Sequence, residues 1–172
     1  MNNSDFVIKK GTIEDAETIY NFIYQLAEYE KLTEEVTTNP EELAKILFAE
    51  NTHVHTIVGF YENRPVGFAL YFYNFSTFKS KTGLYLEDLF VIPEMRGKGF
   101  GKKLLIELAI IAKENDCARF EWSVLDWNKP AIDFYKSLGA KPMDEWTVFR
   151  LTDNGIDKLI KIGNYERNIK EY

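Results

Sequence analysis

The chain has 172 residues, one cysteine and a formal net charge of −6 at pH 7. This length suits one domain, here 1–172 with 163–172 as a tail, and it is enough to bury a core without disulfides. The acidic balance argues against general nucleic-acid binding, which requires a basic face. No apolar run reaches the ~20 residues of a membrane span, and the first residues lack the basic and apolar parts of a signal peptide. We therefore expect a cytoplasmic protein that does not bind membranes.

Hydrophobic periodicity, caps and turn residues predict the elements of the chain. In order they are a strand at 6–9, a helix from Thr12 to about 30, a helix starting at 38–42, strands at 55–61 and 66–73 joined by a turn at 62–65, a polar loop at 74–83, a strand at 84–91, a helix from 101 to about 115, a strand at 117–125, a helix from Asn128 to Gly139, a strand at 146–151 and a short helix at 156–162. This order predicts a mixed α/β fold with helices packed on a central sheet.

A basic, glycine-rich turn separates the strand at 84–91 from the helix that follows it. Its residues 96–103 read Arg-Gly-Lys-Gly-Phe-Gly-Lys-Lys. A Walker A loop is excluded because Arg96 stands where its first glycine belongs and Lys103 where its Ser or Thr belongs. The dinucleotide fingerprint is excluded because Lys102 replaces its last glycine. The pattern that fits is Arg-x-x-Gly-x-Gly, and free amides at the helix start make it a candidate anion site. The alternative is a helix start with incidental lysines.

Three further features allow both a structural and a functional interpretation. Acidic residues gather at the end of the first helix, where they form either a solvated face or a rim that attracts an amine. The loop at 74–83 carries Phe75 and Phe78, which either line a pocket or cover the edge of the core. His53 and His55 have no Cys, Asp or Glu arranged around them, so we expect no metal site.

Three segments together resemble the GNAT superfamily of acetyl-CoA-dependent N-acetyltransferases. They are Tyr-Leu-Glu-Asp-Leu-Phe-Val at 85–91, Arg-Gly-Lys-Gly-Phe-Gly at 96–101 and the Asn-x-Pro-x-x-x-Phe-Tyr pattern from Asn128 to Tyr135. Within the superfamily the chain resembles the spermidine/spermine (diamine) branch, which includes thialysine acetyltransferases. The resemblance extends from Phe6 to Leu151. It implies a mixed, mostly antiparallel central sheet with helices on both faces.

The resemblance also implies a role for each matching position. Tyr135 matches the general acid and Glu87 the proposed general base, while Glu30 and Asp88 match acidic positions that line the amine site. The implied acetyl-CoA contacts are made by the strand residues Leu89, Phe90 and Val91, by the loop residues Arg96, Gly97, Lys98, Gly99, Phe100, Gly101 and Lys102, and by the helix cap Asn128.

The chemistry of acetyl transfer suits these residue types. An alkylammonium has a pKa near ~10.4, so a carboxylate such as Glu87 must take its proton, directly or through water. A strand amide can stabilise the charge that builds on the carbonyl oxygen. A tyrosine can donate to the departing thiolate. Neither a metal nor an enzyme nucleophile is needed.

The acceptor amine is the least determined part of the prediction. The loop at 74–83 carries Lys79 and Lys81 but no acid. In the diamine enzymes this region contributes an aromatic residue to the amine site, commonly a tryptophan, and Phe78 is the nearest candidate here. A small amino acid with a side-chain amine, as in thialysine, is therefore as plausible as a diamine or polyamine. Two other hypotheses are acetylation of a protein lysine or N-terminus, which lids at 30–38 or 74–83 would prevent, and a non-catalytic acetyl-CoA-binding module. The resemblance suggests a homodimer with 146–151 near its interface.

Overall fold

The structure is a computed structural model that describes residues 5–162. These residues belong to two compact units, one ending at Ser123 and the other beginning at Val124. The predicted tail at 163–172 lies outside the described residues. Each unit is described by itself below.

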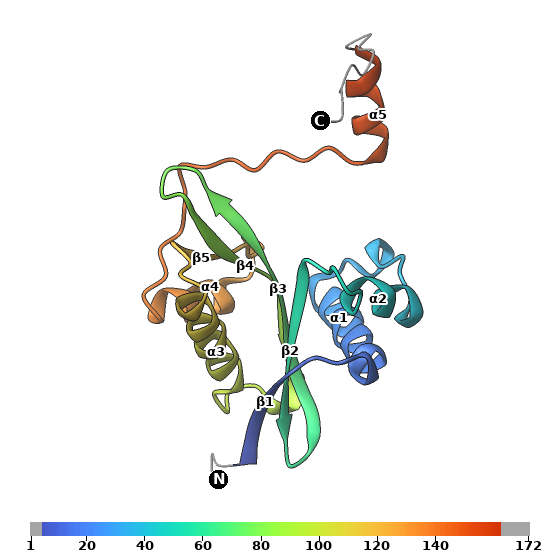
Figure 1. The fold of residues 1–172 in the computed structure, drawn as a ribbon. Coiled ribbons are helices and arrows are strands. Elements are labelled where there is room, and N and C mark those ends of the chain that lie inside the picture. The colour runs from blue at the N-terminus through green and yellow to red at the C-terminus, as the bar shows by residue number, and fades with distance from the viewer. Residues whose placement is uncertain (1–4, 163–172) are drawn as a thin grey trace. The chain divides into compact units, whose positions relative to one another are not determined.

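The first unit holds the sheet and three helices, and the second holds two helices. The first unit comprises β1 (Phe6–Lys10), α1 (Ala16–Glu30), α2 (Pro40–Leu47), β2 (Val54–Tyr61), β3 (Arg64–Ser76), β4 (Lys81–Val91), α3 (Phe100–Glu114) and β5 (Phe120–Trp122) (Figure 1). The second unit comprises α4 (Lys129–Ser137) and α5 (Asp153–Ile162).

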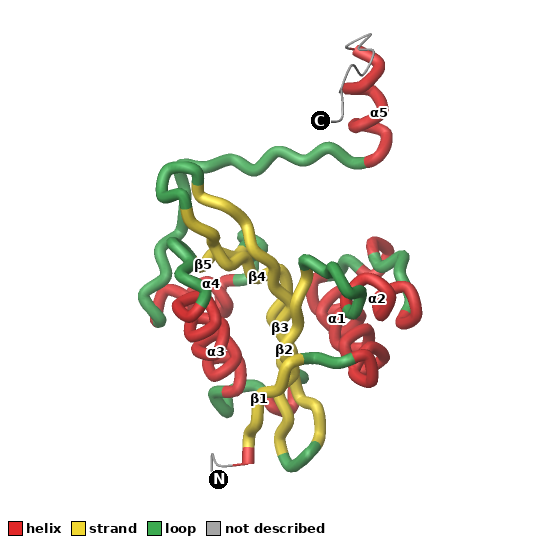
Figure 2. The backbone as a smooth tube through the Cα atoms, viewed as in Figure 1, coloured by secondary structure: helices red, strands yellow, loops and turns green. Residues whose placement is uncertain are grey.

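The sheet has the order β1-β2-β3-β4-β5. Its first four strands pair antiparallel, and β5 is parallel to β4. Figure 2 shows α1 and α2 on one side of the sheet and α3 on the other. The predicted fold, a mostly antiparallel sheet with helices on both faces, is therefore confirmed.

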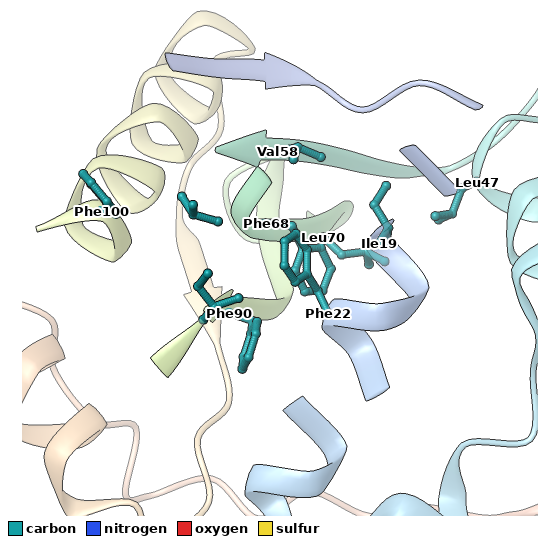
Figure 3. Packing of buried hydrophobic residues seen from close by; sticks show 10 residues of the cluster. Ile19, Phe22, Leu47, Val58, Phe68, Leu70, Phe90 and Phe100 are labelled. Carbon is teal, nitrogen blue, oxygen red and sulfur yellow. The ribbon is translucent and has the colours of Figure 1, made fainter. Parts of the chain in front are cut away.

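The core on the α1 side is built from aromatic side chains of the helix and the two central strands. The ring of Phe22 lies 5.8 Å from that of Phe68 and 5.9 Å from that of Phe90, measured between centroids. Ile19 and Leu70 complete this layer (Figure 3). Burying large apolar side chains is the main stabilising contribution in such a layer, and it fixes α1 against β3 and β4.

Local sequence explains where the helices of the first unit begin and end. Before α2, the side chain of Asn39 accepts a hydrogen bond from the Glu42 amide at 2.9 Å, and Pro40 takes the first helical position. At the end of α1, Lys31 adopts a left-handed conformation with φ of 62°. This conformation stops the helix directly after Glu30.

The hairpin formed by β3 and β4 is longer than the sequence predicted. The segment predicted as a polar loop at 74–83 is mostly strand, because Asn74 pairs with Gly83 and Ser76 pairs with Lys81. Only 77–80 forms the turn, with Ser80 at φ of 48°. The prediction of a loop at 74–83 was therefore wrong. Polar side chains suit a strand where it extends beyond the helices that cover the rest of the sheet.

Two other predicted strands also need correction. The strand expected at 117–125 is reduced to β5, whose pairing with β4 ends at Leu86 and Trp122, where β4 itself becomes irregular. The strand expected at 146–151 is not a strand, since no strand among the described residues pairs with it. Alternating apolar residues favour a strand, but a strand exists only beside a hydrogen-bonded neighbour. Among residues 5–162, no helix combines the length and apolarity that a membrane crossing requires.

Candidate active site

A β-bulge in β4 lies at the centre of the candidate site. Leu70 of β3 pairs with Asp88, but the next residue, Tyr71, pairs with Leu86. Glu87 is therefore an extra residue without a cross-strand partner, and its side chain is exposed. Asp88 shares the α1 face of the sheet with its partner Leu70, because directly paired side chains lie on the same face.

Beyond the bulge, one edge of β4 has no neighbouring strand within the first unit. Pairing with β5 stops at Leu86. The amide of Ile92 donates to the carbonyl of Val66 in β3 at 3.0 Å. Because amides alternate sides along a strand, those of Leu89 and Val91 point away from β3, towards the open edge. They can bind an extended ligand, whereas Phe90 directs its amide towards β3 and buries its side chain in the core.

The glycine-rich turn leads from this edge of β4 into α3. Gly97 and Gly99 have φ values of 75° and 84°, a left-handed region that favours glycine. A Cβ atom added at either position would meet no atom within 4 Å, so the backbone faces open space. The first backbone bond into α3 runs from the Lys103 amide to the Gly99 carbonyl at 3.1 Å. The amides of 100–102 precede it and have the geometry of an anion site at a helix start.

Some side chains of this turn contact other residues of the protein and so cannot contact a ligand at the same time. The buried ring of Phe100 stacks on Phe6 with a centroid distance of 4.3 Å. The ammonium group of Lys98 contacts the sulfur of Met95 at 3.1 Å. Lys102 is exposed. Phe100 can therefore offer a ligand only its backbone, while Lys102 can offer its charge.

Arg96 also makes contacts within the protein. Its Nε–H donates to the carbonyl of Val91 at 3.0 Å. Its guanidinium carbon lies 4.9 Å from the ring centroid of Tyr29 in α1 and 5.5 Å from that of Phe90. Tyr29 was not among the predicted site residues. Its proximity in sequence to Glu30 was the one available signal, since no motif links a helix end to a loop some seventy residues later.

Asp88 lies close enough to Glu87, its neighbour in β4, and to Glu30, the last residue of α1, for the charges of both to act on it. Burial, together with the smaller effects of the Glu87 and Glu30 charges, raises the pKa of Asp88 to about 7. Burial also raises the pKa of Glu30. The ion pairs found in the described part of the chain, such as Lys81–Asp116 and Arg119–Glu121, do not involve these three acids. Concentrated negative charge of this kind favours a cationic ligand.

Phe78 is not brought to these acids within one chain. It lies in the turn at the tip of the β3–β4 hairpin and is 96% exposed. The pairs Ser76–Lys81 and Leu70–Asp88 are six residues apart along β3, which corresponds to about 20 Å of strand. The segment at 74–83 is accordingly a projecting hairpin rather than a lid over Asp88.

Asn128 and Tyr135 belong to the second unit, at the two ends of α4. The side chain of Asn128 accepts a hydrogen bond from the amide of Ala131 at 3.3 Å, which confirms it as the helix cap. Pro130 follows within the first turn. Tyr135 lies in the last turn, with its ring 5.4 Å from that of Phe134. Within residues 5–162, no group of three or more His, Cys, Asp or Glu side chains is arranged to hold a metal ion.

Comparison with known proteins agrees with this geometry. Residues 16–140 match the model of the acetyltransferase (GNAT) family. The thialysine N-epsilon-acetyltransferase of Sus scrofa is 37% identical over 164 residues, which cover 89% of this chain and 96% of that protein. An L-ornithine N5-acetyltransferase of Arabidopsis thaliana is 43% identical over 96 residues, which cover 56% of this chain and 42% of that protein.

A solved structure with a similar fold is an integron cassette protein from the mobile metagenome of V. cholerae. The TM-score is 0.77 at 30% sequence identity, and the match covers 91% of this chain and 98% of that one. The family match spans β4, the glycine-rich turn and α4. The chain therefore belongs to the GNAT family and is an acetyl-CoA-dependent N-acetyltransferase.

Proposed function

We propose that the chain acetylates a primary amine on a small molecule: the side-chain amine of a basic amino acid such as thialysine, or a diamine or polyamine. The observation that carries this proposal is the acidic group formed by Glu30, Glu87 and Asp88 beside the open edge of β4. An alkylammonium carries a positive charge at neutral pH, so these carboxylates attract it. Relatives that act on thialysine and on ornithine support a compact, cationic acceptor.

The residues of the first unit fit the shape and charge of acetyl-CoA. The outward amides of Leu89 and Val91 suit the amide groups of an extended pantetheine arm. The backbone around Gly97 and Gly99 leaves open space, and the amides of 100–102 suit a pyrophosphate. When bound, the cofactor supplies an acetyl group activated as a thioester. Asn128 is proposed to contact the pantetheine arm from the second unit.

Proton transfer is assigned to two residues. Glu87 accepts a proton from the ammonium group, directly or through water, which frees the nitrogen lone pair to attack the thioester carbonyl. An outward amide of β4 donates a hydrogen bond to the carbonyl oxygen as negative charge builds on it. The attacking nitrogen then loses its second proton to water, the carbon–sulfur bond breaks, and the Tyr135 hydroxyl donates its proton to the CoA sulfur. Tyr135 regains a proton and Glu87 releases one by exchange with solvent. The acetylated amine leaves as a neutral amide.

This mechanism requires both units to act as one catalytic domain. The family match supports that requirement, because it runs from 16 to 140 and so crosses the boundary between Ser123 and Val124. We further propose a homodimer with 146–151 near its interface. In such a dimer, Phe78 at the hairpin tip is available to line the amine site of the other copy.

An acceptor screen tests the proposal. The purified chain is incubated with acetyl-CoA and one of thialysine, lysine, ornithine, diamines, spermidine or a lysine-containing peptide, and the release of CoA is measured. We expect turnover with a small cationic amine. Turnover with the peptide alone would instead make the chain a protein acetyltransferase. Binding of CoA without any turnover would support a non-catalytic acetyl-CoA-binding module.

A further inference from the structure

We propose that Arg96 and Tyr29 form a tether between the cofactor loop and the amine-binding end of α1, and that Arg96 acts as a positioning residue rather than as a ligand of the pyrophosphate. This inference rests on the proposed function, since it concerns how the two halves of that site are held together. It assigns a role to Tyr29 and changes the role expected for Arg96.

The contacts of Arg96 direct its side chain towards α1 and β4. Its Nε–H is used by the carbonyl of Val91, five residues earlier, at 3.0 Å. Its guanidinium lies over the rings of Tyr29 and Phe90. Phe90 packs against Phe22 of α1, so the guanidinium reaches the helix-covered side of β4. An arginine side chain that binds the phosphate would instead point towards the open space beside Gly97 and Gly99.

These contacts join three parts of the proposed site. The bond to Val91 closes the backbone turn between the end of β4 and the start of the glycine loop. The contact with Tyr29 reaches the last turn of α1, where the next residue is Glu30. Cation–π contacts of this kind at an exposed site change an equilibrium constant by about two- to fivefold. A substitution at one end of the tether should therefore change the position or mobility of the segment at the other end.

The position of Glu30 makes the tether relevant to acceptor binding. Glu30 ends α1, and Lys31 adopts the left-handed conformation directly after it. The final turn of a helix has fewer internal hydrogen bonds than its middle, so contacts made by its side chains have more influence on its position. Tyr29 supplies such a contact. We infer that it holds the carboxylate of Glu30 at a constant distance from the cofactor loop.

Steady-state kinetics with two acetyl donors test this role. The donors are acetyl-CoA and S-acetylpantetheine, which carries the same thioester but no pyrophosphate. With both donors, Arg96→Met should raise the KM for the amine about fivefold and Tyr29→Leu about two- to fivefold, with kcat changed less than about twofold. The amine KM of the double variant should not exceed that of Arg96→Met alone, because both substitutions remove the same contact.

Two matched variants make the result specific. Tyr24→Leu alters a tyrosine of the same helix with similar exposure, 40% against 37% for Tyr29, and it should leave the amine KM unchanged. Tyr29→Phe retains the aromatic ring, so its amine KM should lie closer to the wild-type value than that of Tyr29→Leu. An equal rise in KM with Tyr24→Leu would overturn the proposal, as would additive effects in the double variant. So would an Arg96→Met defect seen with acetyl-CoA but not with S-acetylpantetheine, which would make Arg96 a phosphate ligand.

Hydrogen exchange tests the tether without turnover. Arg96→Met should speed amide exchange at 28–31, and Tyr29→Leu should speed it at 97–101, because each change releases the opposite end. Exchange that changes only around the substituted residue would show that no tether exists. If the wild type acetylates none of the amines screened, the proposed function fails, but this measurement still decides whether the tether is present.

Discussion

Glu87 and Asp88 are neighbours in sequence but occupy different environments, because Glu87 is the extra residue of a β-bulge and Asp88 is paired with β3. Asp88 pairs with Leu70 and is partly buried on the α1 face, whereas Glu87 has no cross-strand partner and is exposed. Burial and, to a smaller extent, the charges of Glu87 and Glu30 raise the pKa of Asp88 to about 7. The bulge thus gives one strand an exposed carboxylate beside a partly buried one whose pKa is raised towards neutrality.

The raised pKa of Asp88 predicts a pH dependence of acceptor use. Below about pH 7 the carboxyl group is protonated and attracts an ammonium ion less, so kcat/KM for the amine should fall. Asp88→Asn removes this titration. The ratio of the wild-type to the variant kcat/KM, measured from about pH 5.5 to 8.5, cancels the ionisation of the amine itself. We expect it to rise about tenfold across neutrality. A flat ratio would remove Asp88 from amine recognition.

The same raised pKa predicts a cost in stability. Below pH ~3.8 the carboxyl group is protonated in both the folded and the unfolded chain, so its ionisation does not lower the free energy of unfolding. As the pH rises towards 7, the unfolded chain loses this proton first, so stability falls. Asp88→Asn should therefore increase the free energy of unfolding at pH 8, by at most ~4 kcal/mol, and by less at pH 5. Urea unfolding at both pH values measures this. The exposed Glu94→Gln serves as the control, and an equal effect of Asp88→Asn at both pH values would contradict the assignment.

Cofactor binding should depend on the left-handed glycine of the loop. Gly99→Ala places a Cβ atom on a residue with φ of 84°, and such a conformation costs about 1–2 kcal/mol for an L side chain. The added atom also occupies the open space proposed for the cofactor. We expect CoA affinity, measured by calorimetry, to fall about tenfold or more.

Gly101→Ala is the matched comparison for that prediction. Its Cβ atom would meet the side chain of Val91 at 3.8 Å, an ordinary contact distance, and its φ is not positive. Its effect on CoA affinity should be smaller. Equal losses for the two variants would indicate that the left-handed conformation of Gly99 is unimportant.

The proposed acid and base should be separable by kinetics. Tyr135→Phe should lower kcat at least about tenfold and leave CoA affinity unchanged, since it removes a proton donor rather than a contact with the cofactor. Glu87→Gln should lower kcat and shift the pH–rate profile. An unchanged kcat in the first variant would remove the acid role of Tyr135. An unchanged pH profile in the second would point to another base, with Asp88 as the first to examine.

Sequence patterns predicted the elements well where a local signal was strong. The apolar stripe of α1, the capping residues Asn39 and Asn128 and the glycines before α3 all act over a few residues. Predictions failed where pairing partners decide the outcome. The loop expected at 74–83 became strand because Asn74 and Gly83 pair, while 146–151 is not a strand despite its alternating apolar residues.

The sequence by itself determined the family, the location of the glycine loop and the residue types available for proton transfer, since these depend on short motifs at fixed spacing. Only the tertiary structure decided how Glu87 and Asp88 differ, because a bulge is a mismatch between two strands and is not visible in either one. The same holds for Arg96. Its motif suggested a phosphate ligand, but its contacts with Tyr29 and Phe90 arise from segments that folding brings together.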